Sequence, residues 1–211
     1  MNLLWLEGLL IMALNERFNT VNAQIIKAAH SSKRDPDSIT LLAVTKRQGI
    51  ETIKALSQLG VTHFGENQVL EGIDKVKFLK DLGLMWHFIG HIQGNKAKLV
   101  SQHFDWVHSV DSLKVAEKLN SARDKSLPPL NICLQVNIDN SPTKYGVMAS
   151  DLMDLASLVN QLPRLKLRGL MAIPDPASDE VTKKNYQYLS DLKGQLNQKN
   201  SDQKKVPKDE K

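Results

Sequence analysis

Short apolar runs alternate with helical patterns along most of the chain. Six runs rich in β-branched and aromatic residues are expected to form strands, at 39–45, 61–65, 85–90, 104–110, 131–138 and 167–173. Between them, apolar residues recur at helical spacing over 50–59, 69–82, 96–103, 113–122 and 152–162. This alternation is typical of β/α units that build a parallel sheet. The first run is apolar at every position from 41 to 44, so we expect helices to cover both faces of that sheet.

The two ends of the chain depart from this rhythm. A helical spacing of apolar residues begins at Leu14 and closes at Ala29, and Asp35-Pro36 is expected to end that helix. Residues 1–13 are expected to be a leader, with Met12 as an alternative start. After a last helical pattern near 186–196, residues 197–211 lack an apolar period and are predicted to form a disordered basic tail. The expected domain is therefore 14–196.

The charge of the chain argues against nucleic acid as a partner. The net charge is +5, but residues 1–180 carry 20 basic and 19 acidic side chains, so the excess lies in the tail. The single cysteine excludes a disulfide framework and indicates a reducing compartment. No segment is long and apolar enough for a membrane span, because the best candidate, near 3–14, is interrupted by Glu7 and Gly8. We expect a cytoplasmic protein.

Six β/α units leave two architectures open. A closed eight-stranded barrel typically needs about 250 residues, more than this chain has. An open, doubly wound sheet would fit six strands. However, no strand is followed by the glycine-rich motif of the dinucleotide-binding or P-loop folds, which weakens both common nucleotide-binding versions.

Lys46 is the first candidate for chemistry. It follows an apolar strand, and in α/β folds functional residues collect at the carboxyl ends of strands. A lysine at the mouth of an apolar cavity loses its charge more easily, and a neutral amine forms a Schiff base with an aldehyde. The alternative is that Lys46 and Arg47 are solvated loop cations.

Other strand-end residues also have two interpretations. Asn67 follows its strand as Lys46 does, so it is either a polar contact to a ligand or a cap of the strand. His87 and His91 have a spacing that suits a zinc site on a helix, but on a strand and loop a core or pocket histidine is favoured.

Two further residues favour structural roles. Cys133 lies in an apolar run, so a buried core thiol is favoured over a nucleophile. Asn95 precedes a helical pattern, which favours a helix cap over an anion ligand.

Four motifs together resemble the pyridoxal phosphate homeostasis protein family. They are Leu41-Leu42-Ala43-Val44-Thr45-Lys46, Phe64-Gly65-Glu66-Asn67, Trp86-His87-Phe88-Ile89-Gly90 with Gln93 and Asn95-Lys96 after it, and the run from Leu167 to Pro174. The resemblance covers about 14–174. It implies an α/β fold, a TIM-type (β/α) barrel like the N-terminal domain of alanine racemase. It also implies pyridoxal 5'-phosphate bound to Lys46 as an internal aldimine, with Asn67 and His87 as further cofactor-binding candidates. Lys144-Tyr145-Gly146, after the fifth strand, resembles the family's second-lysine loop, and the alternative for Lys144 is a solvated lysine in a turn.

The resemblance also implies two strands that this sequence does not show. Members of the family continue with a seventh and an eighth strand, whose runs hold the cofactor phosphate. Neither run follows Pro174, so we expect an incomplete barrel of about six of eight strands and a chain truncated at its C-terminus.

Three functions remain open. The resemblance favours a cofactor-binding protein of intracellular vitamin B6 homeostasis, a monomer without turnover that passes the cofactor to apo enzymes. The first alternative is a racemase-like enzyme, although racemisation needs acid/base groups on both faces of the substrate. The second alternative is a remnant that has lost cofactor binding.

Overall fold

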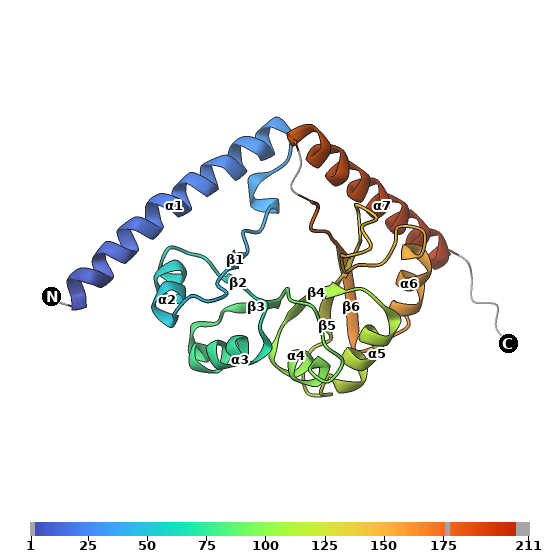
Figure 1. The fold of residues 1–211 in the computed structure, drawn as a ribbon, viewed down its shortest axis with the longest axis horizontal. Coiled ribbons are helices and arrows are strands. Elements are labelled where there is room, and N and C mark those ends of the chain that lie inside the picture. The colour runs from blue at the N-terminus through green and yellow to red at the C-terminus, as the bar shows by residue number, and fades with distance from the viewer. Residues whose placement is uncertain (1–2, 176–177, 206–211) are drawn as a thin grey trace. The chain divides into compact units, whose positions relative to one another are not determined.

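The computed structural model describes residues 3–175 and 178–205, and the chain divides into two compact units, one up to His87 and one from Phe88 onward (Figure 1). Its strands confirm the predicted α/β class. They follow in the sheet in the order of the chain, β1 to β6, the printed pairings are parallel, and the described strands do not close a barrel. The expectation of about six strands in an incomplete barrel is therefore confirmed. We consider each unit separately.

The first unit places three short strands among helices. Its elements are α1 (Leu3–Ser31), the 3-10 turn η1 (Pro36–Ser38), β1 (Ala43–Val44), α2 (Ile50–Gln58), β2 (His63–Glu66), α3 (Val69–Phe78), η2 (Lys80–Leu82) and β3 (Met85–Phe88), whose last residue belongs to the second unit. Asp35 accepts a hydrogen bond from the amide of Asp37 and Pro36 occupies the first turn, which explains the predicted break after α1. The core includes Phe64 and Trp86, whose ring centroids lie 5.8 Å apart.

Strand β1 is shorter than the predicted run 39–45. Only Ala43 and Val44 form the strand, because their partners are Phe64 and Gly65 and β2 itself begins at His63. The expectation that this run is buried on both faces is also wrong, since Val44 is 46% exposed. The buried residue at this strand end is Thr45, at 2% exposure.

The second unit holds the longer strands. Its strands β4 (Trp106–Val110), β5 (Leu130–Gln135) and β6 (Leu165–Met171) are parallel and are interrupted by two register shifts. Helices α4 (Ala97–His103), α5 (Leu113–Ala122) and α6 (Leu152–Val159) pack in succession beside these strands, and α7 (Asp179–Lys205) contacts β6. The core is aliphatic around Leu119, Leu130, Ile132 and Leu134, all fully buried.

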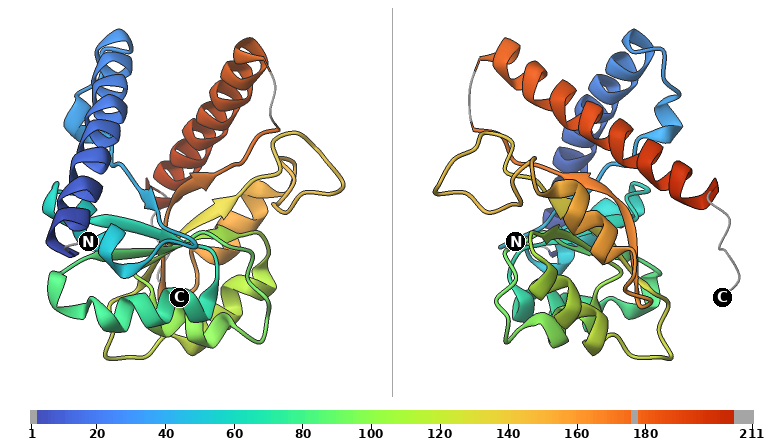
Figure 2. Two further views of the ribbon diagram at one scale, coloured as in Figure 1. Left: turned by 60° about the vertical axis from the view of Figure 1, so that its left-hand side comes forward. Right: turned by 90° about the vertical axis from the view of Figure 1, so that its right-hand side faces the viewer.

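Both long helices extend beyond their predicted bounds (Figure 2). The leader expected over 1–13 is helical from Leu3 and continues into the predicted helix, and Met12 within it is 70% exposed. The predicted tail from residue 197 is helical in α7 as far as Lys205, whereas 206–211 lie outside the described residues. Side-chain pairs four residues apart support α7, such as Lys184 with Glu180 at 2.9 Å. The domain bounds 14–196 remain a prediction.

Two smaller expectations have clear outcomes. Asn95 does not cap α4, because the residue before the helix is Lys96, which has helical dihedrals and makes no capping bond through its side chain. Cys133 is a buried thiol, as expected, and burial raises its pKa to about 11.

In the described part of the chain, no helix combines the length and apolar character of a membrane span.

Arg123 organises the polar backbone of the second unit. It is 7% exposed and follows α5, where its guanidinium donates to the carbonyl oxygens of Ser101, Phe104 (3.0 Å) and Pro128 (2.8 Å). These carbonyls lie at the end of α4 and in the two loops that precede β4 and β5, so one side chain satisfies acceptors that the helix and strand ladders leave open.

We predict that Arg123→Met lowers the free energy of unfolding by about 3 kcal/mol, because three acceptors lose a charged donor. Urea unfolding followed by circular dichroism measures this as a lower midpoint with an unchanged slope. Lys125→Met, at an exposed lysine of the same loop, is the control and should change stability by less than about 0.5 kcal/mol. Equal effects of the two substitutions would contradict this role of Arg123.

Cys133 provides a second prediction, because a thiol must be exposed and ionised to react. Ellman's reagent at near-neutral pH should leave Cys133 unmodified in the folded protein and modify it fully in urea. A Ser126→Cys variant, with a second thiol in an exposed loop, should react at that thiol without urea. Rapid reaction of Cys133 in the folded protein would show that the thiol is accessible.

Candidate functional site

Lys46 and Asn67 occupy matching positions at the ends of two paired strands. Val44 of β1 is in register with Gly65 of β2, and the two candidates each follow by two residues. Both side chains are exposed. The Asn67 side chain makes no hydrogen bond with the residues that the structure describes, so the strand-cap interpretation has no support in these contacts.

A buried ion network lies directly beside Lys46. Glu66 is fully buried, and its Oε1 atom accepts hydrogen bonds from Thr45 Oγ1 at 2.7 Å and from Lys75 Nζ at 2.8 Å. Lys75, only 6% exposed, also donates to Glu71 Oε1 at 2.7 Å and to the Thr45 carbonyl at 2.8 Å. The network therefore joins the ends of β1 and β2 to α3.

The second carboxylate of this network is Glu71. The hydrogen bond from Lys75 lowers the pKa of Glu71 below its usual value; partial burial opposes the shift, and the Arg47 amide reinforces it. Glu71 is therefore ionised at neutral pH. The Glu66 Oε2 atom has no partner among the described residues, and a buried carboxylate oxygen of this kind commonly binds an ordered water.

His87 lies within β3 and not at its end. It is 5% exposed, and its Nε2 atom is 2.9 Å from Nδ1 of His63 in β2, so one of the two rings donates an N–H hydrogen bond to the other. This places His87 in the core, as the favoured interpretation expected. His91 stacks on Tyr145 with centroids 3.7 Å apart, and the described residues contain no cluster of three metal-ligating side chains for a zinc site.

Lys144 is paired, and the alternative of a solvated lysine is wrong. Its ammonium lies 2.6 Å from Asp139 and 2.7 Å from Asp175, and it donates to the Ile173 carbonyl at 2.9 Å. Partial burial by itself lowers the pKa of Lys144, but the hydrogen bonds to the two carboxylates outweigh it and the pKa lies above its usual value. A cavity of about 200 Å³ adjoins this loop in the second unit.

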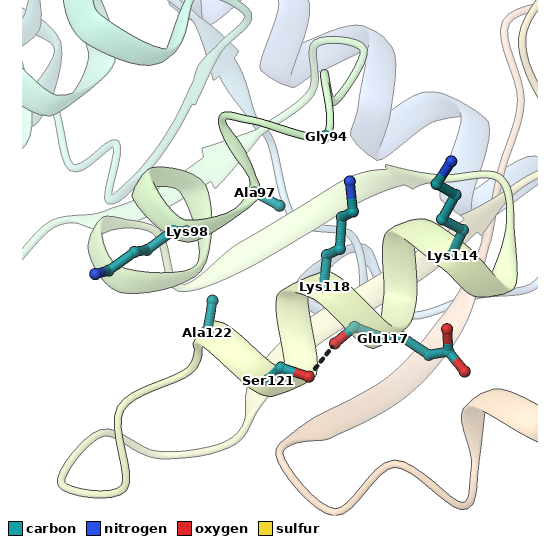
Figure 3. A pocket seen from close by; sticks show the side chains of 8 residues that line it. All are labelled: Gly94, Ala97, Lys98, Lys114, Glu117, Lys118, Ser121 and Ala122. Carbon is teal, nitrogen blue, oxygen red and sulfur yellow. Dashed lines mark hydrogen bonds between the residues drawn. The ribbon is translucent and has the colours of Figure 1, made fainter.

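A larger pocket of about 430 Å³ lies between α4 and α5 (Figure 3). Lys114 and Lys118 extend from α5 in the same direction, and Lys118 lies against Gly94, where a side chain would collide with its ammonium. The pocket belongs to the second unit and contains none of the three predicted cofactor-binding residues. The remaining lining residues are Ala97, Lys98, Glu117, Ser121 and Ala122.

The sequence analysis missed the roles of Glu66, Glu71 and Lys75. Glu66 was noticed only as part of a motif, and the acidic and basic pair at Glu71 and Lys75 has the spacing of an ordinary exposed helix pair. The available signal was a charged residue, Glu66, at the end of a strand directly after Phe64 and Gly65. Burial of such a residue requires a partner.

Comparisons with known proteins agree with this arrangement of strands. The family model described as "Alanine racemase, N-terminal domain" matches residues 21–206. The pyridoxal phosphate homeostasis protein of Escherichia coli is 47% identical over 164 residues, which are 76% of this chain and 70% of the relative. The protein of that name in Pseudomonas aeruginosa is 46% identical over 166 residues, covering 79% and 72%.

A solved structure is similar over a larger share of the chain. PipY of Synechococcus elongatus, with pyridoxal phosphate bound, is 34% identical and superposes with a TM-score of 0.72 over 84% of this chain and 82% of that protein. Together with the predicted motifs and the observed fold, these matches show that the chain belongs to the pyridoxal phosphate homeostasis protein family, built on the fold of the alanine racemase N-terminal domain.

Proposed function

We propose that this chain binds pyridoxal phosphate through a Schiff base on Lys46 and serves intracellular vitamin B6 homeostasis without turnover. The observation that carries the proposal is the environment of Lys46: an exposed amine on a turn whose neighbouring residues are fixed by a buried network. Relatives named pyridoxal phosphate homeostasis proteins, and PipY with pyridoxal phosphate bound, support the choice of ligand.

The residues around Lys46 fit such a ligand. Bound pyridoxal phosphate supplies an aldehyde, which condenses with a primary amine and releases water. Lys46 provides the amine, and no carboxylate of the described residues is paired with it. Asn67, exposed at the matching strand end, contributes a polar contact. The His87 ring is buried, so we assign His87 an indirect role in cofactor binding, through its hydrogen bond to His63.

The other lysines near strand ends are unsuitable for this reaction. Lys75 donates to two carboxylates and a carbonyl, and Lys144 to two carboxylates and a carbonyl. The nitrogen atoms of both lysines are therefore occupied by hydrogen-bond acceptors, which an aldehyde would have to displace before it could reach the amine. The protein as proposed acts as a cytoplasmic monomer that releases the cofactor to apo enzymes.

We predict that pyridoxal phosphate gives a visible absorption band and that borohydride fixes it mainly on Lys46. Peptide mapping by mass spectrometry locates the adduct. Lys46→Arg keeps the positive charge but cannot form a Schiff base, so the band and the adduct should be lost. Lys77→Arg, the same substitution at an exposed lysine of α3, should leave both unchanged. An adduct spread evenly over the exposed lysines would contradict the proposal.

We also predict that the protein does not accelerate the racemisation of L-alanine beyond free pyridoxal phosphate at the same concentration. Racemisation needs basic groups on both faces of the reacting carbon. Of the three proposed site residues, only Lys46 offers an exposed basic group, since Asn67 is not a base and His87 is buried. Chiral chromatography of D-alanine measures the rate. Racemisation that requires Lys46 would instead support the racemase-like alternative.

A further inference from the structure

The backbone on the N-terminal side of Lys46 is fixed at every polar group of Thr45. The Thr45 amide donates to the Gly65 carbonyl at 3.0 Å, and its hydroxyl donates to Glu66 at 2.7 Å. Its carbonyl accepts a hydrogen bond from Lys75 Nζ at 2.8 Å. The residue before Lys46 therefore has no freedom to rotate without breaking a buried hydrogen bond.

The backbone on the C-terminal side of Lys46 is fixed by the same ammonium group through a carboxylate. Arg47 has a φ of 61°, a left-handed conformation that non-glycine residues adopt infrequently. Its amide donates to Glu71 Oε1 at 2.8 Å, and the same oxygen accepts a hydrogen bond from Lys75 at 2.7 Å. Lys75 thus contacts one neighbour of Lys46 directly and the other through Glu71.

Every N–H donor of Lys75 has an acceptor within the network. An ammonium has three N–H donors, and those of Lys75 go to Thr45, Glu66 and Glu71. Burying this charge with Glu66 carries a large desolvation cost, which a surface pair at Lys75 and Glu71 alone would avoid. What the burial adds is the hydrogen bond to the Thr45 carbonyl, next to the reactive lysine.

We propose that Lys75 is a positioning residue for Lys46: it fixes the backbone on both sides of Lys46 and so holds that amine where an aldehyde ligand can be bound. The proposal rests on the proposed function for the identity of the ligand. The fixed turn itself can be tested without any ligand.

The first experiment measures amide hydrogen exchange of the ligand-free protein by NMR. Lys75→Met should accelerate exchange of the Arg47 and Gln48 amides by about tenfold, because both lose the acceptor geometry that Lys75 maintains. The Gly60 amide at the end of α2 lies outside the network and serves as the internal reference for a general loss of stability. Lys77→Met, at an exposed lysine of the same helix, is the matched control.

The second experiment measures the distribution of the borohydride-fixed pyridoxal phosphate adduct among the lysines. In folded Lys75→Met protein, the ratio of Lys46 adduct to adduct on other lysines should fall about tenfold, equivalent to one charge-assisted hydrogen bond. A purely structural role of Lys75 would lower the urea midpoint and leave this ratio unchanged in the folded protein. Lys77→Met should keep the wild-type ratio.

Two more variants keep the proposal testable if Lys75→Met does not fold. Lys75→Met leaves Glu66 buried without a charged partner, so the double variant Lys75→Met/Glu66→Gln removes both charges and still lets Thr45 donate to residue 66. If neither variant folds, the Glu71→Gln variant tests the proposal. The Glu71 side chain is 28% exposed, so this substitution is tolerated more easily, and the loss of its charge should still accelerate exchange of the Arg47 amide several-fold.

The outcomes separate the two proposals. Faster exchange at Arg47 and Gln48 together with loss of the Lys46 preference supports positioning by Lys75. Unchanged exchange and an unchanged ratio in a folded variant overturn it. If wild-type protein shows no Lys46 adduct while Lys75→Met still accelerates exchange at Arg47, the proposed function fails and the fixed turn stands.

Discussion

The buried pairing of Glu66 with Lys75 is the constraint on which the first strand ends depend. A carboxylate and an ammonium removed from water must satisfy each other and the remaining hydrogen-bonding groups around them. Here the partners come from the end of β2 and from α3, and the third participant is Thr45 at the end of β1. Any shift of one element relative to the others would leave a buried charge without its partner.

This constraint explains how a strand of two residues can hold the backbone of Lys46 in place. Strand β1 has little ladder of its own, since only Ala43 and Val44 pair with β2. The network extends the connection beyond the ladder through the side chain of Thr45 and the amide of Arg47. Lys46 lies between these two anchored residues, so its backbone is held although its side chain is exposed.

Three lysines of this chain show how surroundings alone divide one residue type into separate roles. Lys75 is buried and fully hydrogen-bonded, so it anchors the groups around it. Lys144 ties the loop after β5 to Asp139 and Asp175, with a pKa raised by those carboxylates against partial burial. Lys46 is exposed and has no such carboxylate among the described residues, which leaves its amine available for chemistry.

The sequence by itself determined the order and type of nearly all elements, the fold class and the family. Helix α5 covers the predicted 113–122, and β3 begins at the predicted Met85, because periodic burial of side chains on one face of an element is a local property of the sequence. The four motifs that carry the family resemblance are likewise contiguous in the chain. Two segments without a regular apolar period were placed less well: the N-terminal part of α1, which is a nearly continuous apolar run, and the C-terminal part of α7.

Only the tertiary structure decided the contacts that give these residues their roles. Thr45 and Glu66 are 21 positions apart, and Thr45 and Lys75 are 30 apart, so no local pattern relates them. The length of β1 depended on where β2 begins, and the pairing of Lys144 depended on Asp175 from a distant loop. The physical reason is that a hydrogen bond between charged groups acts over about 3 Å in space, and the packing of the strands and helices brings such distant residues together.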